Sequence, residues 1–142
     1  MIVVAGVDDS PVAKAVLSEA IQEAEWRNAE LHVVHVVHLP VVYAEIPIDT
    51  TQVAQAERRT VWEALGPIID SAALTVERVD LEGYPPDLLV DYASRSGASL
   101  LVVGTRGRGE LASLILGSTS HRAIHLAKCD VLVVKAKQAD EA

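Results

Sequence analysis

The chain has 142 residues, half of them hydrophobic, and a formal net charge of −8. This length suits one domain with its own core, and the negative charge argues against nonspecific binding to nucleic acid or to an anionic membrane. Phe is absent and other aromatics are scarce, so the core must be built from Val, Leu, Ile and Ala. Such a composition is typical of strands that are buried on both faces. We therefore expect a single domain over residues 1–142.

The cysteine content and the lengths of the apolar runs limit the class of protein further. The single cysteine, Cys129, excludes an intramolecular disulfide framework and favours a packed thiol over a reactive one. Met1 leads directly into an apolar run without a basic segment, and the apolar runs are only about five to seven residues long. We expect no signal peptide, no membrane span and a cytoplasmic location.

Short apolar runs alternate with helical stretches in the first half of the chain. Residues 2–7 are the first predicted strand, and Asp8-Asp9-Ser10-Pro11 is a helix-start signal with Pro near the first helical position. After the first helix we expect a strand over 31–37, a loop over 39–49 and a helix over 51–71. The positions predicted to form the buried helix faces are Ala13, Val16, Leu17, Ala20, Ile21 and Ala24, and then Val53, Ala56, Thr60, Val61, Ala64, Leu65 and Ile68.

The second half of the chain continues the same alternation. Residues 74–81 alternate apolar and charged side chains, which predicts an exposed or edge strand. The remaining predicted elements are a helix from about 87 to 96 that ends near Gly97, a strand over 99–103, a helix to about Ala127 and a strand over 131–134. The sequence therefore predicts an α/β fold: a five-stranded parallel sheet with helices on both faces.

This fold class also predicts where a ligand binds. In open parallel sheets, ligands bind outside the carboxyl ends of the strands, where the strand order reverses. Asp8, the end of the second strand near Val36, and Gly104 all lie at strand carboxyl ends. We expect these three positions to converge.

A glycine-rich segment follows the fourth predicted strand. Glycine lets backbone N–H groups approach an anion closely, and the helix that follows begins with further N–H groups. A Walker A loop is excluded, because Glu110 occupies the position of its lysine after Gly104 and Gly109. A loose dinucleotide fingerprint at Gly107, Gly109 and Ala112 is in the wrong place, since that motif belongs to the first strand–helix turn. The remaining pattern, Gly-x2-Gly-x9-Gly-Ser, consists of Gly104, Gly107, Gly117 and Ser118.

This pattern and its surroundings resemble the universal stress protein family, and the resemblance covers nearly the whole chain. It rests on residues 3–11, His35-Val36, 102–109, 116–118 and 129–134. In that family the glycine pattern marks the members that bind ATP. The resemblance implies a five-stranded α/β sandwich, an ATP site and homodimerisation through the last strand.

The family's site residues can be carried over one by one. Asp8 would bind the ribose hydroxyls, and the backbone of Val36 would face adenine. The other implied positions are Gly6 and Val7 beside the ribose, Val103 near the base or sugar, and Gly104, Gly107, Gly117, Ser118 and the backbone of Thr119 at the phosphates. The implied cofactor is ATP. A glycine nest binds a phosphate group but does not distinguish how many phosphates the ligand carries, so AMP, ADP and a cyclic nucleotide remain possible ligands. Asp8-Asp9 indicates Mg²⁺ only weakly.

Two residues depart from the family pattern. Asp9 stands where the family often has Gly and adds negative charge near the site. Asp130 replaces a common Pro before the last strand, which bears on the geometry of the dimer.

Three functions are compatible with these residues. The favoured one is an ATP-binding stress-response regulator with little or slow turnover and no catalytic residue. The first alternative is a weak ATPase or a protein that phosphorylates itself on Ser118 or Ser120, although these hydroxyls can equally cap the helix. The second alternative is a dimeric interaction module that binds no nucleotide.

Histidines and arginines supply the remaining candidates. His32, His35 and His38 alternate sides along a strand, so they cannot hold one metal as a set. His121 and His125 are four residues apart on a helix, and solvated or packed histidines are favoured over a metal site there. Arg106 and Arg108 flank the loop glycines, where phosphate contact and solvent exposure both stay open.

Overall fold

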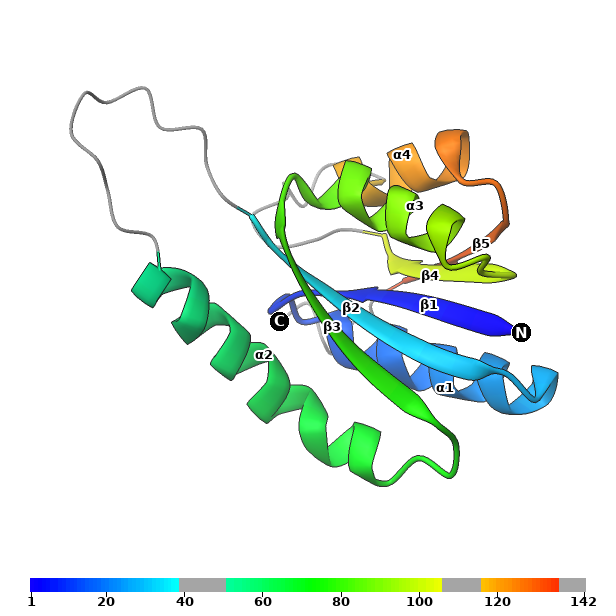
Figure 1. Ribbon diagram of the computed structural model, residues 1–142, viewed down its shortest axis with the longest axis horizontal. Coiled ribbons are helices and arrows are strands. Elements are labelled where there is room, and N and C mark those ends of the chain that lie inside the picture. The colour runs from blue at the N-terminus through cyan, green and yellow to red at the C-terminus, as the bar shows by residue number, and fades with distance from the viewer. Residues whose placement is uncertain (39–50, 106–115, 136–142) are drawn as a thin grey trace.

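The computed structural model describes residues 1–38, 51–105 and 116–135. Its strands form one sheet in the order β3-β2-β1-β4-β5, and every pair of neighbouring strands is parallel. The strands are β1 (Ile2–Val7), β2 (Glu30–His38), β3 (Val76–Gly83), β4 (Leu100–Gly104) and β5 (Asp130–Val134). The helices are α1 (Ala13–Arg27), α2 (Thr51–Asp70), α3 (Pro85–Arg95) and α4 (Ser118–Leu126) (Figure 1). The predicted α/β fold with a five-stranded parallel sheet is confirmed.

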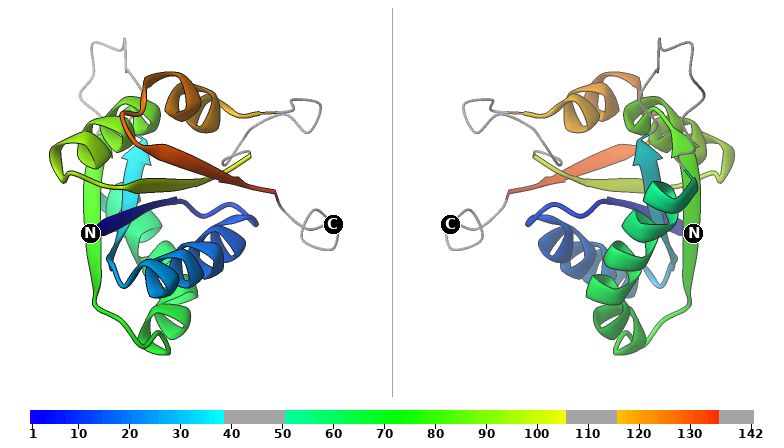
Figure 2. Two further views of the ribbon diagram at one scale, coloured as in Figure 1. Left: turned by 90° about the vertical axis from the view of Figure 1, so that its right-hand side faces the viewer. Right: turned by 90° about the vertical axis from the view of Figure 1, so that its left-hand side faces the viewer.

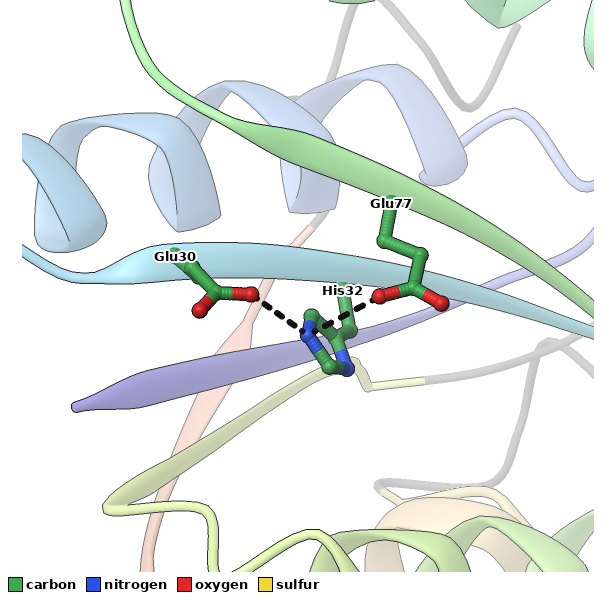
Figure 3. Close-up of side chains that lie close together, drawn as sticks. All are labelled: Glu30, His32 and Glu77. Carbon is green, nitrogen blue, oxygen red and sulfur yellow. Dashed lines mark hydrogen bonds and ion pairs between the residues drawn. The ribbon is translucent and has the colours of Figure 1, made fainter.

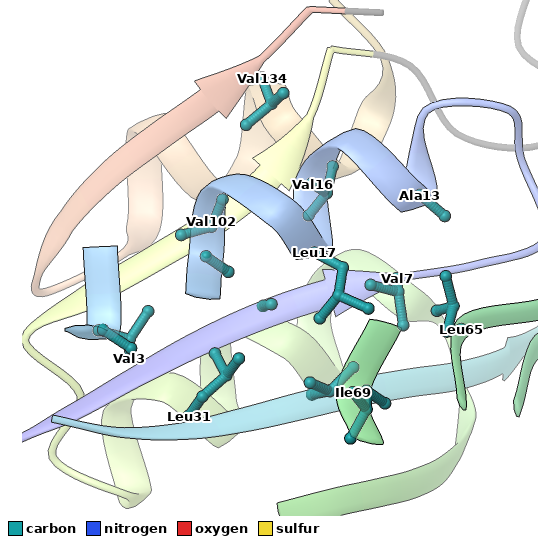
Figure 4. Close-up of a cluster of buried hydrophobic side chains, with 14 of the residues drawn as sticks. Val3, Val7, Ala13, Val16, Leu17, Leu31, Leu65, Ile69, Val102 and Val134 are labelled. Carbon is teal, nitrogen blue, oxygen red and sulfur yellow. The ribbon is translucent and has the colours of Figure 1, made fainter. Parts of the chain in front are cut away.

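The helices form two layers around the sheet. Helices α1 and α2 cover one face, and α3 and α4 cover the other (Figure 2). The larger core cluster packs Leu17 of α1 and Leu65 of α2 against Leu31 and Val102 of the sheet (Figure 4). The smaller cluster places Leu89 of α3 and Ala123 of α4 against the opposite face. Both faces of the central strands are buried, as their continuous apolar runs predict.

The first helix begins later than the sequence predicts. Its first residue is Ala13, and Val12 precedes it as the N-cap. The Ser10 amide donates to Asp8 Oδ1 at 2.9 Å, and the Ala13 amide donates to the Ser10 carbonyl at 3.2 Å. An Asp that binds the amide two residues further on forms a turn, and this turn replaces the predicted helix start at Asp8-Asp9-Ser10-Pro11. The predicted buried face of α1 is otherwise correct, with Ile21 partly buried.

The predicted buried face of α2 is partly wrong. Val61 and Leu65 are buried as expected, but Val53 is 71% exposed, and Ala56, Thr60 and Ala64 are exposed too. The residues that are buried in α2 are Ala54, Val61, Leu65, Gly66 and Ile69. Small or polar residues such as Ala and Thr have little apolar surface to bury, so the large side chains facing the sheet decide how the helix is rotated.

The remaining elements differ from the prediction only at their ends. β3 is an edge strand as expected but begins two residues later, at Val76, and α3 begins at Pro85 instead of 87. Gly97, just after α3, has a φ of 70°, a left-handed conformation that glycine adopts without strain. The predicted loop over 39–49 lies outside the described residues. Among the helices of the described segments, none is long and apolar enough to cross a bilayer.

Candidate functional site

The sheet divides at its carboxyl edge between β1 and β4. These neighbours are paired from Val3–Leu100 to Ala5–Val102, so the last two residues of each strand lie beyond the paired segment. The end of β1 stays paired with β2, and the end of β4 stays paired with β5. Strand order also reverses here, because β2 and β3 extend from one side of β1 while β4 and β5 extend from the other. This is the point where open α/β sheets bind ligands.

Four of the predicted site residues are the strand ends at this division. They are Gly6 and Val7 of β1 and Val103 and Gly104 of β4. Val36 lies on β2 one residue beyond His35, which is the partner of Val7. The structure therefore brings the predicted ribose, base and phosphate positions to one edge of the sheet, except Gly107, which lies outside the described residues.

Side chains at these strand ends point into the core and not toward a ligand. Val7, Val36 and Val103 are 6%, 8% and 1% exposed, so only their backbone groups can face a nucleotide. A Cβ on Gly104 would lie 2.6 Å from Val12 Cγ1 of the turn before α1. Glycine at this position thus allows close packing of β4 against α1 as well as access to its backbone.

Asp8 follows β1 directly and is partly buried. Its Oδ1 accepts the Ser10 amide at 2.9 Å, which fixes the direction of the carboxylate at the end of the strand. A carboxylate has acceptor capacity for several donors, so it suits the adjacent hydroxyls of a ribose. Asp8 and the turn that orients it are therefore a suitable sugar-binding group.

The two ends of the glycine-rich segment are joined by hydrogen bonds. The Thr105 carbonyl, just after β4, accepts the Gly117 amide and, at 3.1 Å, the Ser120 hydroxyl. The Ser120 hydroxyl also lies 3.1 Å from the Gly117 carbonyl, and the Thr105 amide donates to Val134 of β5 at 2.9 Å. These contacts hold the start of α4 beside the end of β4.

Sequence reasoning missed the structural role of Ser120. The sequence left helix capping and phosphate contact open for this hydroxyl. Ser120 is 1% exposed and donates to the backbone carbonyl of Thr105, so it closes the loop instead of facing solvent. The sequence shows only a serine in the first turn of a predicted helix, which indicates neither the burial of its hydroxyl nor its distant partner.

The start of α4 has the properties of an anion-binding helix terminus. Gly117 is the N-cap, it has no side chain to bond the first amides, and no acidic residue lies in the first turn. The free amides at a helix start and the helix dipole both favour negative charge. Ser118 and Thr119 are the first two residues of this helix, so the predicted phosphate positions after Gly117 lie at its positive end. Arg106 and Arg108 lie outside the described residues.

The three strand histidines point to different faces, as the sequence predicts. His32 Nδ1 lies 2.8 Å from the Tyr92 hydroxyl of α3, whereas His35 Nδ1 lies 3.2 Å from Asp80 Oδ1 on the face of α2. Burial raises the pKa of Tyr92, and the charges of the two nearby glutamates, Glu77 and then Glu30, add to this effect. Tyr92 is therefore a neutral phenol near neutral pH.

The other polar candidates are consistent with structural roles. The His121 and His125 rings on α4 are 4.6 Å apart, and both residues are exposed. Cys129 is partly buried, and burial raises the pKa of its thiol, with a further rise from the charge of Asp130. A raised pKa keeps the thiol protonated and less nucleophilic, which supports the prediction of a packed cysteine.

The sequence and the fold of this chain are similar to those of known proteins. The model of the universal stress protein family matches residues 1–135. Universal stress protein A homolog 1 of Coxiella burnetii is 35% identical over 143 residues, covering 96% of each chain. A universal stress protein of Mycobacterium tuberculosis is 33% identical over 139 residues, which cover 94% of this chain and 45% of the relative. The chain therefore spans about half the length of some curated relatives.

Solved structures of the same fold include nucleotide complexes. A universal stress protein in complex with cAMP is 27% identical, with a TM-score of 0.72 and coverage of 95% of this chain and 96% of that one. The Archaeoglobus fulgidus universal stress protein in complex with dAMP is 28% identical, with a TM-score of 0.68 and coverage of 94% and 96%. The family model, the curated relatives and the solved structures agree: this chain belongs to the universal stress protein family.

Proposed function

We propose that this protein binds an adenine nucleotide, with ATP as the favoured ligand, at the carboxyl edge between β1 and β4. It would then act as a nucleotide-dependent regulator in a stress response. The observation that carries the proposal is the division of the sheet at the switch point, with Asp8 at the end of β1 and the hydrogen-bonded backbone of Thr105 and Gly117 after β4. A carboxylate suits ribose hydroxyls, and a helix start with a glycine N-cap suits phosphate. Related structures that hold dAMP and cAMP support the same ligand class.

Binding with little or slow turnover is the favoured form of this proposal. The alternative of self-phosphorylation on Ser120 is disfavoured, because that hydroxyl is buried and donates to the Thr105 carbonyl. Ser118 then remains as the residue to test. A comparison of ADP release between the wild type and Ser118→Ala separates the two forms. Self-phosphorylation at Ser118 predicts a release of ADP that the variant loses, whereas a binding protein with little or slow turnover gives the same low release in both.

The first experiment identifies the nucleotide directly. The purified protein is denatured, and the released small molecules are identified by mass spectrometry. Calorimetric titrations with ATP, ADP, AMP and cAMP, each with and without Mg²⁺, then rank the affinities. No binding at millimolar concentration of any of the four contradicts the proposal.

Substitution of Asp8 tests the sugar-binding role. Asp8→Asn keeps an oxygen that can accept the Ser10 amide at the same position but removes the negative charge. Hydrogen bonds to a charged group contribute about 1.5–3 kcal/mol, so we expect nucleotide affinity to fall by about tenfold to a hundredfold. Asp9→Asn is the matched control, because it removes the neighbouring charge and should weaken binding little or even strengthen it. Equal losses in the two variants contradict a specific role for Asp8.

Substitution of Gly117 tests the phosphate cradle and distinguishes regulation from scaffolding. Gly117 has φ −77° and ψ 175°, an extended conformation that valine adopts readily, so Gly117→Val should fold. Its branched side chain would occupy the space in front of the first amides of α4 and should abolish binding. Cells that carry this variant and keep the stress phenotype would favour the dimeric interaction module that needs no nucleotide.

A further inference from the structure

A second polar cluster lies at the opposite edge of the sheet from the nucleotide site. Glu30 is the first residue of β2, His32 follows two residues later, and Glu77 is the second residue of β3. In the parallel register His32 is paired with Glu77. Side chains two residues apart on a strand share a face, as do paired residues on neighbouring strands, so all three project toward α3. The register therefore places the three side chains on one face of two neighbouring strands.

The two carboxylates converge on a single nitrogen. His32 Nε2 lies 3.2 Å from Glu30 Oε1 and 3.5 Å from Glu77 Oε2 (Figure 3). All three candidate ligand atoms lie within 4.8 Å of one another, and no second group of this kind occurs among residues 1–38, 51–105 and 116–135. Four-coordinate zinc binds N and O ligands at about 2.0–2.2 Å, which places neighbouring ligand atoms about 3.3–3.6 Å apart. The two nitrogen–oxygen distances already match such a site.

The histidine is held in the orientation that a metal ligand needs. His32 is 7% exposed, and its other nitrogen, Nδ1, lies 2.8 Å from the Tyr92 hydroxyl of α3. When Nε2 binds a cation, the remaining imidazole proton is on Nδ1 and donates to Tyr92 Oη. Histidine ligands in proteins regularly make such a contact through the second nitrogen.

The charges and the exposure of the cluster also suit a cation. The side chains of Glu30 and Glu77 are 52% and 61% exposed, whereas the imidazole between them is buried. The carboxylates can therefore close by side-chain rotation without disturbing the sheet, and water can supply a fourth ligand. Two carboxylates and one neutral imidazole balance the charge of a divalent ion.

We propose that Glu30, His32 and Glu77 form a binding site for a divalent transition-metal cation, zinc in particular, at the amino edge of β2 and β3. Nitrogen together with carboxylate oxygen is a ligand set that zinc accepts, whereas Mg²⁺ and Ca²⁺ prefer oxygen alone. A cation bound here links the edge strand β3 to β2. Tyr92 is a positioning residue for His32.

The test is a titration of the tag-free, metal-stripped full chain with zinc chloride by calorimetry. His125→Asn serves as the background throughout, because two exposed histidines four residues apart on α4 are zinc-accessible side chains whose contribution has to be removed from the titration. We expect one zinc per chain with micromolar or tighter affinity. Glu77→Gln and Glu30→Gln should each weaken binding at least tenfold, and Tyr92→Phe by about tenfold to a hundredfold. Glu25→Gln, an exposed carboxylate on α1, should leave the affinity unchanged.

Nitrogen-15 NMR of the histidine side chains supplies the readout that identifies the ligand atom. Zinc should shift His32 Nε2 and leave Nδ1 protonated, and excess Mg²⁺ should not compete. Both glutamates are exposed, so their variants should keep the thermal midpoint measured in EDTA. No zinc binding at 100 times the protein concentration, or affinities unchanged by both glutamate variants, would overturn the proposal and leave the cluster as an ion pair. A zinc-dependent shift confined to His121 would overturn it as well.

Discussion

At Gly6 the sheet and α3 approach so closely that an added side chain would have to displace the side chain of Leu89. A Cβ built at this position would lie 2.3 Å from Leu89 Cδ2 and 3.3 Å from Leu89 Cγ. The sequence comparison assigns Gly6 to the ribose wall, yet its lack of a side chain has a packing role on the face of α3. Gly6 also belongs to the two residues of β1 that lie beyond the pairing with β4. Packing and ligand access thus constrain the same residue.

The substitution Gly6→Ala should therefore destabilise the protein. The added methyl group displaces a buried leucine, and overpacking of this kind costs about 1–3 kcal/mol. Chemical denaturation measures the loss. In a Leu89→Ala background, Gly6→Ala should lower the free energy of unfolding much less, because truncation of Leu89 leaves room for the added methyl group. A double-mutant cycle gives the difference as the coupling energy between the two residues. Equal costs in both backgrounds would show that the contact with Leu89 is not the cause.

At the scale of single elements, the ends of α1 and α3 differ in a way that the sequence does not show. The C-cap after helix α1 is Asn28, whose φ of 52° and ψ of 47° are left-handed, and its amide donates to the carbonyls of Ala24 and Glu25. The C-cap after helix α3 is Ser96 with a φ of −78°, and the left-handed residue there is Gly97. Asparagine tolerates the left-handed region better than most residues, but glycine adopts it without a steric cost.

Substitutions at these two ends should have opposite effects. Asn28→Gly should stabilise the protein by up to about 1 kcal/mol, and Asn28→Val should destabilise it by about 1–2 kcal/mol. The control is Ser96→Gly, which should be neutral or destabilising because Ser96 is not left-handed. Denaturation midpoints at constant m-value give the three changes. If Ser96→Gly stabilised the protein as much as Asn28→Gly, the backbone explanation would fail.

At the scale of the whole molecule, the two edges of the sheet have different chemistry. Edge strand β3 has charged residues at Glu77, Arg78, Asp80 and Glu82, and charges on an edge discourage pairing with another chain. Edge strand β5 has Val131, Leu132 and Val133, all only partly buried in the single chain. The resemblance to the family implies a homodimer through the last strand, and the apolar edge of β5 supports this as a proposal.

A pair of edge substitutions tests the dimer. Val131→Lys on β5 should raise the dimer dissociation constant more than tenfold, because a two-fold interface brings two like charges together. Val76→Lys is the matched control, since Val76 is also a partly buried valine on an edge strand. Sedimentation velocity over a range of concentrations measures both constants. A monomeric wild type, or equal effects of the two substitutions, would contradict a β5 interface.

The sequence alone was sufficient for the element order and the parallel sheet, and it predicted most of the strand ends that meet at the carboxyl edge. Continuous apolar runs such as the one in β4 occur where a strand is covered on both faces, so the fold class can be predicted from the hydrophobic pattern. Asp8, Gly104 and Gly117 were predicted as site residues because they follow a strand end or belong to the glycine pattern, and they remain candidate site residues. The sequence did not predict which face of α2 is buried. Ala56, Thr60 and Ala64 are small side chains that can lie on a buried or an exposed face of a helix.

Contacts between residues far apart in the chain were decided only by the tertiary structure. The closure of the glycine segment through Ser120 and Thr105, the packing of Gly6 against Leu89 and the pairing of His32 with Glu77 all depend on register and helix placement. Periodicity in a sequence reports which face of an element is buried but not which residue lies opposite it. The sequence by itself therefore determined the family and the fold class and predicted the edge at which we propose nucleotide binding, whereas the second cluster, at the amino edge, became visible only once β2 and β3 were aligned.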